Sequence, residues 1–269
     1  MPVIIDGTNG VSTPNTFAFK NRIIDGGFTI NQRGYVSGTS LSSGSYGHDR
    51  WKGGASGGTY TFTQASAGVN TTITITAGSI IQVIEGANLP EGGTYVLSWT
   101  GTAQGKIGSG SFGASGITGT ITAGTNTNIE FNTGTCGNVQ LEVGSTATSF
   151  DYRPYGTELA LCQRYYQTSY QGSAVGSATT TNAIGYWYAA TSNYSNLVVY
   201  LRTTMRSQPT VTLYSPVTGA SGKMDVNFTG DVNANSQYLS SNAFQAYIDN
   251  VSVAAGTNTQ FHYAASIEL

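Results

Sequence analysis

The two stretches of sequence that decide the fold are NRIIDGGFTINQRGYVSGTSLSSGSYGHDRW (Asn21–Trp51) and VQLEVGSTATSFDYRPYGTELALCQRYY (Val139–Tyr166). In the first, Gly26-Gly27 and Gly34 permit turns that side chains would block. Trp51 is a large apolar residue at the start of an expected core strand. We interpret both stretches as specifying structure rather than contacting a ligand. They mark the two ends of one β-sandwich and the passage to the next domain.

Between these stretches, apolar residues alternate with Thr, Ser, Gln, Asn and Glu at a period of two. Glycine turns such as Pro90–Gly93 separate the alternating runs. The pattern is typical of antiparallel strands with one solvated face, so it predicts a jelly-roll-like β-sandwich over residues 21–157. The expected core positions are Tyr60, Phe62, Ile73, Ile75, Tyr95, Leu97, Trp99, Val139, Leu141 and Val143. Gly101–Gly124 is poor in large apolar residues, and we expect a loop with one weak strand there.

One segment with helical spacing follows Tyr155-Gly156. Thr157 can cap a helix, and Glu158 suits its first turn. The residues near helical spacing are Leu159, Leu161, Cys162, Tyr165 and Tyr166. These features predict a short helical connector over residues 158–172.

A second run of alternating segments predicts a C-terminal β-sandwich domain over residues 173–269. The candidate strands are Gly185–Tyr188, Leu197–Arg202, Thr210–Tyr214, Met224–Phe228, Phe244–Ile248 and Gln260–Glu268. No fixed-period repeat is visible in the sequence, which disfavours β-helices and propellers. The predicted fold class is all-β, with a jelly-roll-like sandwich and a second antiparallel β domain joined by one short helix.

The composition indicates a neutral, polar surface. Charged residues make up 9% of the chain, against about 25% in average soluble domains. A surface of hydroxyls and amides suits hydrogen bonding between subunits or to hydrated glycans better than ionic partners. The 17 Tyr, 10 Phe and 3 Trp argue against disorder.

The charge pattern also excludes some partners. The net charge is −2 and the cations are scattered from Lys20 to Arg206, so we expect no nucleic-acid binding. No apolar run approaches the roughly 20 residues that span a bilayer, so we expect no membrane insertion. Cys136 and Cys162 are expected to be free thiols, as suits assembly in a cytoplasm.

The first 20 residues combine apolar side chains with a Gly/Thr/Asn/Pro stretch that cannot form a helix. We expect residues 1–20 to be an extended attachment arm that docks on a neighbouring subunit, and a frayed terminus is the alternative. The expected docking residues are Val3, Ile4, Ile5, Phe17 and Phe19.

No catalytic, metal or cofactor site can be selected from the sequence. His48 and His262 are far apart and have no Cys, Asp or Glu partner at metal-ligand spacing. His48-Asp49-Arg50 are consecutive, so in a strand they cannot all face one site, although Arg33 or Arg50 can donate to carbonyls at sheet corners. Glycoside hydrolysis needs a facing pair of carboxylates, and no pair stands out. We therefore expect no enzymatic activity, no metal and no cofactor.

Sugar binding is the more credible use of the surface, because sugar C–H groups stack on aromatic rings while amides and hydroxyls bond to sugar hydroxyls. The candidate ligand-binding residues are Tyr186, Trp187, Tyr188 and Tyr194. A strand would place Tyr186 and Tyr188 on one face and Trp187 on the other. A role in the core or in a subunit interface is the competing interpretation.

Several phrases resemble the modular tail-fibre and virion-surface proteins of tailed bacteriophages. Asn21–Arg33 is similar to their N-x-x-x-D/N-G-x-F-x-x-x-Q-R opening, and Asp49-Arg50-Trp51 to the D-R-W that follows. Gln140–Tyr155 resembles the closing strand of carbohydrate-binding-module-like jelly rolls on phage proteins. Glu158–Tyr166 (ELALCQRYY) is the most specific piece, and Leu201–Pro209 resembles the family only in layout.

The resemblance implies a virion protein made in the host cytoplasm, such as a tail fibre or a similar surface appendage. Its expected partners are further copies of itself, as a trimer, other virion proteins through the arm, and host-surface polysaccharide. Two alternatives remain: a capsid-decorating or cement protein without host binding, and a tail-borne polysaccharide depolymerase.

Overall fold

The computed structural model divides into two compact units, which we describe separately. The first unit comprises Met1–Thr29, Ser37–Tyr46 and Arg50–Glu158, and the second comprises Ile30–Val36, Gly47–Asp49 and Leu159–Leu269. The structure describes residues 4–6, 10–12, 19–63, 68–180, 182–187, 195–227, 230–248 and 256–269, with backbone only at 4–6, 10–12, 186–187 and 195–196. The second unit thus takes two short segments from the region that the sequence assigned to the first sandwich.

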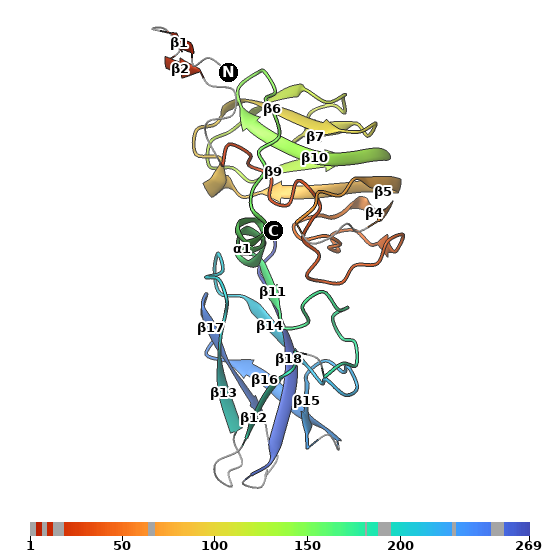
Figure 1. Ribbon diagram of the computed structural model, residues 1–269, viewed down its shortest axis with the longest axis vertical. Coiled ribbons are helices and arrows are strands. Elements are labelled where there is room, and N and C mark those ends of the chain that lie inside the picture. Colours follow the sequence, from red (N-terminus) through yellow and green to blue (C-terminus); the bar gives the residue numbers. More distant parts are fainter. Residues whose placement is uncertain are drawn as a thin grey trace. The chain divides into compact units, whose positions relative to one another are not determined.

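The first unit is a curled antiparallel sheet of eight strands with a jelly-roll-like sandwich architecture (Figure 1). Its strands are β3 (Ser40–Leu41), β4 (Lys52–Thr61), β5 (Ile73–Ile84), β6 (Gly93–Thr100), β7 (Gly105–Ile107), β8 (Ile117–Ile121), β9 (Thr127–Phe131) and β10 (Gly134–Val143). A short 3-10 turn, Gly86–Asn88, precedes β6. The prediction of an all-β chain is confirmed.

Strand β10 belongs to both halves of the sandwich. Its residues 134–136 pair with β5, and its later residues pair with β6 after a register shift between Gly137 and Gln140. Asn138, within the shift, has a φ of 49°. Such a bulge bends a strand and increases its twist, which lets one strand turn the corner between two sheet halves.

Aromatic rings fill the space between the halves. Trp99 of β6 meets Phe131 of β9 edge to face at 5.0 Å. Phe131 also lies 6.0 Å from Trp51, whose ring centroid is 5.0 Å from that of Phe28. The predicted core positions in this unit are buried, except that Phe62 is half-buried and Val143, at the end of β10, is 49% exposed.

The segment from Asn21 to Gly26 runs along β10, held largely by side-chain amides. Asn21 Oδ1 accepts hydrogen bonds from Ile23 N and Leu141 N, at 2.9 and 3.0 Å, and Asn21 Nδ2 donates to Val139 O. Gly26 O then accepts from Val139 N at 2.8 Å. The amide of Asn21 therefore satisfies backbone groups that a regular strand would otherwise pair.

The outer face of β10 departs from the expected solvated face, because Gln140 and Glu142 are buried. Glu142 accepts hydrogen bonds from the backbone N and side-chain hydroxyl of Thr148, at 2.8 and 2.7 Å. Gln140 Oε1 accepts from Asp151 N at 2.8 Å. These two side chains fold the following segment back over the strand, which explains why this phrase needs polar residues at alternate positions.

The second unit is another curled antiparallel sheet of eight strands, and β18 (Asn258–Ser266) runs through its centre (Figure 1). The strands that pair with β18 are β11 (Tyr166–Thr168), β12 (Ile184–Trp187), β14 (Thr210–Tyr214) and β15 (Lys223–Val226). Beyond β15 the order continues with β16 (Gly230–Gln237), β17 (Ala243–Ile248) and β13 (Ser195–Tyr200). Phe244 of β17 and Tyr263 of β18 meet edge to face at 5.2 Å in its core.

Two strands of this unit were not predicted. β16 contains only Val232 and Ala234 as apolar residues, so its place depends on pairing with β15 and β17 rather than on alternation. β11 lies where the helical connector was expected to continue. In the first unit, Gly101–Gly124 holds both β7 and β8 rather than one weak strand.

The helix α1 (Tyr155–Gln163) is shorter than the predicted 158–172 connector and begins earlier. Pro154 O accepts hydrogen bonds from Thr157 N and Glu158 N, so Thr157 lies inside the first turn and is not the cap. Helix formation stops where Tyr166–Thr168 pairs with Ala264–Ser266 of β18. Strand pairing thus overrides the helical spacing of Tyr165 and Tyr166.

The described part of the arm forms a small hairpin, in which β1 (Ile4–Asp6) pairs with β2 (Gly10–Ser12). Ile4 and Ile5 lie on β1, whereas Val3 and Phe17 lie outside the described residues. Phe19 is 55% exposed, with the Arg153 guanidinium 5.6 Å from its ring centroid. Docking of this arm on another protein stays a prediction.

Cys136 and Cys162 are both buried, and among the described residues neither forms a disulfide, in line with the expected thiols. Burial raises the pKa of the Cys136 thiol, so it stays protonated. In the described part of the chain, no helix has the length and apolarity needed to cross a bilayer.

Gly26→Ala is expected to destabilise the first unit by about 1–3 kcal/mol, because the added Cβ would lie 2.2 Å from the backbone oxygen of Val139. Gly156→Ala is the matched control, since no atom lies within 4 Å of its added Cβ and Ala favours a helix by up to about 1 kcal/mol. Urea unfolding followed by tryptophan fluorescence measures both. Equal stabilities of the two variants would contradict the close approach of Gly26 to β10.

Candidate functional site

Of the four predicted sugar-binding residues, the structure describes two, and only their backbone. Tyr186 and Trp187 lie on β12, opposite Thr259 and Asn258 of β18. Tyr188 and Tyr194 lie outside the described residues. The backbone of the first two is therefore part of the central sheet of the second unit, and their role as a sugar platform stays a prediction.

A different tyrosine stands out on strand β13. Leu197 and Val199 turn toward the core, so the alternation turns Val198 and Tyr200 outward. Val198 is 49% exposed and Tyr200 is 76% exposed. β13 is the terminal strand in the order of this sheet, so these side chains stand at a sheet margin.

Neighbouring strands extend this outward surface. Val198 lies opposite Gln245, which lies opposite Gln237, and Asn235 lies opposite Tyr247. Residues directly opposite in antiparallel strands place their side chains on the same face. We call this surface the tyrosine–amide face and define it as Val198, Tyr200, Asn235, Gln237, Gln245 and Tyr247.

The chemistry of the tyrosine–amide face is uncharged and rich in hydrogen-bonding groups. Gln237 Nε2 donates to Gln245 Oε1 at 2.7 Å, which orients both amides. None of the six side chains that define the face is Asp, Glu, Lys, Arg or His. Phenol rings can stack on sugar C–H groups while amides bond to sugar hydroxyls, so the face can take a neutral glycan.

The sequence alone does not reveal the tyrosine–amide face, for an identifiable reason. The predicted strand Leu197–Arg202 already implies that Val198 and Tyr200 point the same way. However, β16 was not predicted, and the pairing of β13 with β17 cannot be read from one sequence. The neighbours of Tyr200 become visible only with the register of the sheet.

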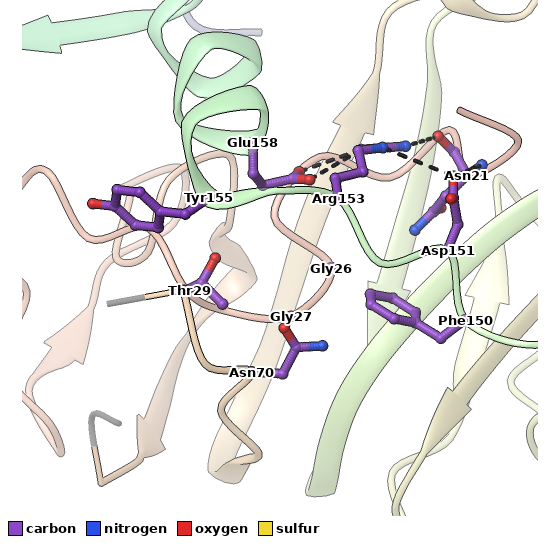
Figure 2. Close-up of a pocket in the computed structure, with 11 residues that line it drawn as sticks. Asn21, Gly26, Gly27, Thr29, Asn70, Phe150, Asp151, Arg153, Tyr155 and Glu158 are labelled. Carbon is purple, nitrogen blue, oxygen red and sulfur yellow. Dashed lines mark hydrogen bonds and ion pairs between the residues drawn. The ribbon is translucent and has the colours of Figure 1, made fainter. Parts of the chain in front are cut away.

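In the first unit, a small polar pocket surrounds Arg153, and Figure 2 shows how its side chain reaches toward Glu158 and Asn21. Arg153 Nη1 donates to Ile23 O at 3.0 Å and to both Glu158 carboxylate oxygens at 3.3 Å. Its Nη2 donates to Asn21 O. The Glu158 carboxylate also accepts from Asp25 N.

The pocket around Arg153 is too small for a ligand. Its cavity volume is about 20 Å³, which accommodates about one water molecule. Asn70 and Phe150 help to close it (Figure 2). We therefore assign Arg153 and Glu158 to holding the Asn21–Gly26 segment against the start of α1, which is a structural role.

The strongest electrostatic cluster of the second unit centres on Arg33. Its guanidinium lies 2.6 Å from Asp49 Oδ1 and 2.9 Å from Glu268 Oε1, and 3.6 Å from the ring centroid of Tyr166. All of these side chains are largely buried. Gln32 adds a hydrogen bond to Tyr166 O, at 2.9 Å. The cluster joins three chain segments and leaves Arg33 no access to a ligand.

Burial raises the pKa of Asp49 from 3.8 to about 6, although the nearby Arg33 partly opposes this shift.

The consecutive residues His48, Asp49 and Arg50 contact different parts of the structure, as their spacing predicted. His48 packs near Tyr35, with ring centroids 6.3 Å apart. Arg50 donates to Val83 O in the first unit at 2.7 Å.

A serine and a histidine that no sequence pattern links lie within hydrogen-bonding distance in the second unit. Ser169 Oγ lies 2.9 Å from His262 Nδ1, and His262 Nε2 lies 2.9 Å from Thr179 O. Since a carbonyl can only accept, Nε2 carries the proton and Nδ1 accepts from the serine. Burial lowers the pKa of His262, which stacks on Tyr170 at 4.1 Å. Both Ser169 and His262 are buried, and Ser169 Oγ also accepts from Tyr263 N at 3.0 Å. The pair therefore fits a core hydrogen bond.

Among the described residues, no group of three or more His, Cys, Asp and Glu side chains could hold a metal ion. No protein-family model, curated protein or solved structure matches the chain. The function is therefore inferred from the phrases of the sequence and from the geometry above.

Asp49→Asn is expected to change how stability depends on pH. Because the pKa of Asp49 is about 6 when folded and 3.8 by default, ionisation favours the unfolded chain. The stability of the wild type relative to Asp49→Asn should therefore fall by about 2 kcal/mol as the pH rises from 4 to 7. Urea unfolding across this range measures the difference. A difference that grows with pH would mean that Arg33 outweighs burial and holds the pKa of Asp49 low.

Proposed function

We propose that this protein is a noncatalytic structural protein of a bacteriophage virion, a tail fibre or similar surface appendage, that binds host-surface glycans. The observation that carries the proposal is the tyrosine–amide face, where Tyr200 is 76% exposed and Gln237 donates a hydrogen bond to Gln245 on the same face. An exposed phenol ring offers an apolar face on which sugar C–H groups can stack. Neutral amides beside it suit a ligand whose polar groups are hydroxyls.

Two further features support a virion role. The first is that the segments resembling phage fibre modules stabilise the fold: the Asn21 side chain hydrogen-bonds to the backbone of β10, and Arg33 forms a buried ion pair with Asp49. The second is the low charge of the whole chain, which gives little repulsion between identical subunits crowded on a particle.

The assembled state in this proposal is a homo-oligomer, with a trimer as the form that the resemblance implies. The arm, with Ile4 and Ile5 on β1, would attach the protein to other virion components. Locating the protein on intact particles by electron microscopy separates a tail appendage from a capsid decoration. Density confined to the capsid shell, with no glycan binding, would favour a cement protein instead.

Tyr200→Ala is expected to weaken binding to host polysaccharide by about tenfold or more, because the change removes the largest stacking surface of the tyrosine–amide face. Tyr152→Ala is the matched control: Tyr152 is a similarly exposed tyrosine, at 70%, in the first unit. Glycan-array and surface plasmon resonance measurements with purified host capsule or lipopolysaccharide compare both variants with wild type.

Equal binding by the Tyr200 and Tyr152 variants would reject the tyrosine–amide face as the glycan site. New reducing or unsaturated ends after incubation with the polysaccharide would instead identify a depolymerase. The same samples serve both measurements, so binding and cleavage are told apart directly.

A further inference from the structure

The hairpin that joins β16 to β17 contains one residue more than regular pairing needs. Gln237 of β16 pairs with Gln245 of β17. Beyond this pair, Ser240 N donates to Ala243 O at 2.8 Å. Between these two contacts, the β16 side of the hairpin has two residues, whereas the β17 side has one. Two residues that oppose one form a β-bulge, a feature that re-aims side chains in a sheet.

Tyr238 is the extra residue of this bulge. Leu239 packs against the hydrophobic core to which Phe244 belongs, so these two residues take the inward places of the hairpin. Tyr238 has a φ of 48° and is 79% exposed. The bulge therefore turns the ring of Tyr238 away from the core, next to Gln237 of the tyrosine–amide face.

The backbone conformation of Tyr238 is one that favours glycine. A positive φ is an outlier for a bulky residue and costs free energy, because the side chain crowds the backbone. Strain of this kind is concentrated at binding sites, where a side chain is held in place for its contacts. The turn alone does not explain an aromatic residue here, since glycine would form the same bulge without strain.

Tyr238 and Tyr200 lie on strands that flank β17. Tyr200 of β13 pairs with Ala243, and Ser240 approaches Ala243 from the β16 side. This row across the three strands thus holds only short side chains between β13 and β16. Neighbouring strands are about 4.8 Å apart, so β13 and β16 are separated by about 10 Å. A ligand that stacks on both tyrosines must extend across β17.

Hydrogen bonds fix the backbone at this end of the sheet. Ala243 N donates to Ser240 Oγ at 3.0 Å, which closes the turn after the bulge. Leu201 N donates to Asn242 O at 2.8 Å, which joins the turn to the residue after Tyr200. The backbone that carries both tyrosines is therefore preorganised, which lowers the entropic cost of binding.

We propose that Tyr238 is a second stacking residue of the glycan site, so that the site binds an extended chain of sugar residues lying across β17. In this arrangement one sugar stacks on Tyr200 and a later sugar of the chain stacks on Tyr238, while Gln237 and Gln245 bond to hydroxyls. The inference rests on the proposed glycan-binding function. It specifies the ligand as an internal segment of a polysaccharide rather than a single terminal sugar.

The test compares fragments of different length from the same host capsule or lipopolysaccharide. Single sugars, disaccharides and tetrasaccharides, prepared by partial hydrolysis and gel filtration, are titrated into the full-length protein by isothermal titration calorimetry. Affinity should rise about tenfold from the single sugar to the tetrasaccharide, because only the longer fragment reaches both rings. Tyr238→Ala should remove most of this gain, whereas Tyr238→Phe should retain it. Tyr152→Ala is the matched control, since Tyr152 is 70% exposed in the first unit.

Tyr238→Gly separates a binding role of the ring from a structural one. Glycine adopts a positive φ without strain, so the melting temperature of the second unit should rise while the affinity for the tetrasaccharide falls. A lower melting temperature in this variant would mean that the ring of Tyr238 supports the hairpin, and it would overturn the inference.

The outcomes also separate this inference from the proposed function. Equal affinities for the single sugar and the tetrasaccharide, or an unchanged tetrasaccharide affinity in Tyr238→Ala, would overturn the extended site. If polysaccharide binding is still lost with Tyr200→Ala in that case, the proposed function stands without Tyr238. If the wild type binds neither the polysaccharide nor any fragment, both fail.

Discussion

The buried contact of Arg33 with Asp49, Glu268 and Tyr166 is the constraint on which the second unit depends. A guanidinium taken out of water must be met by carboxylates and hydrogen bonds, and here the partners come from separate parts of the chain. Loss of any one partner would leave a buried charge without its counterpart. The arrangement therefore dictates where residues 30–36, residues 47–49 and the end of the chain must lie.

This contact need not add much net stability. The desolvation of buried ions can exceed their mutual attraction, and the raised pKa of Asp49 has this origin. What the cluster supplies is specificity, because an apolar core alone would tolerate several positions of the segments that carry Arg33 and Asp49. Within the Asp49-Arg50-Trp51 phrase, Asp49 belongs to the second unit, whereas Arg50 and Trp51 belong to the first.

Much of the fold could be predicted where burial follows alternation. Tyr95, Leu97 and Trp99 point into the core as expected, and most predicted strands of the C-terminal region are present. The failures share a physical cause. Gln140 and Glu142 are polar yet buried, and β16 is a strand with little apolar content, because hydrogen bonds to neighbouring segments, rather than the alternation of apolar residues, decide their places. A single sequence does not show which segments form these hydrogen bonds.

The candidate site was less predictable than the fold. The aromatic residues of the sequence favoured Tyr186–Tyr188 as the site, whereas the exposed ring on the tyrosine–amide face is that of Tyr200. Gln237 and Gln245 are distant from Tyr200 in sequence, and only the strand register brings them to the same face.

The central structural claim is that the second unit needs the segments Ile30–Val36 and Gly47–Asp49 to complete its core. The most direct measurement is urea unfolding of the isolated fragment Leu159–Leu269, followed by near-ultraviolet circular dichroism beside the full chain. Without its Asp49 and Arg33 partners, Glu268 and Tyr166 lose the contacts that cover them, so the fragment should show no cooperative transition. A fragment that unfolds cooperatively at the same urea concentration as the second unit in the full chain would contradict this account.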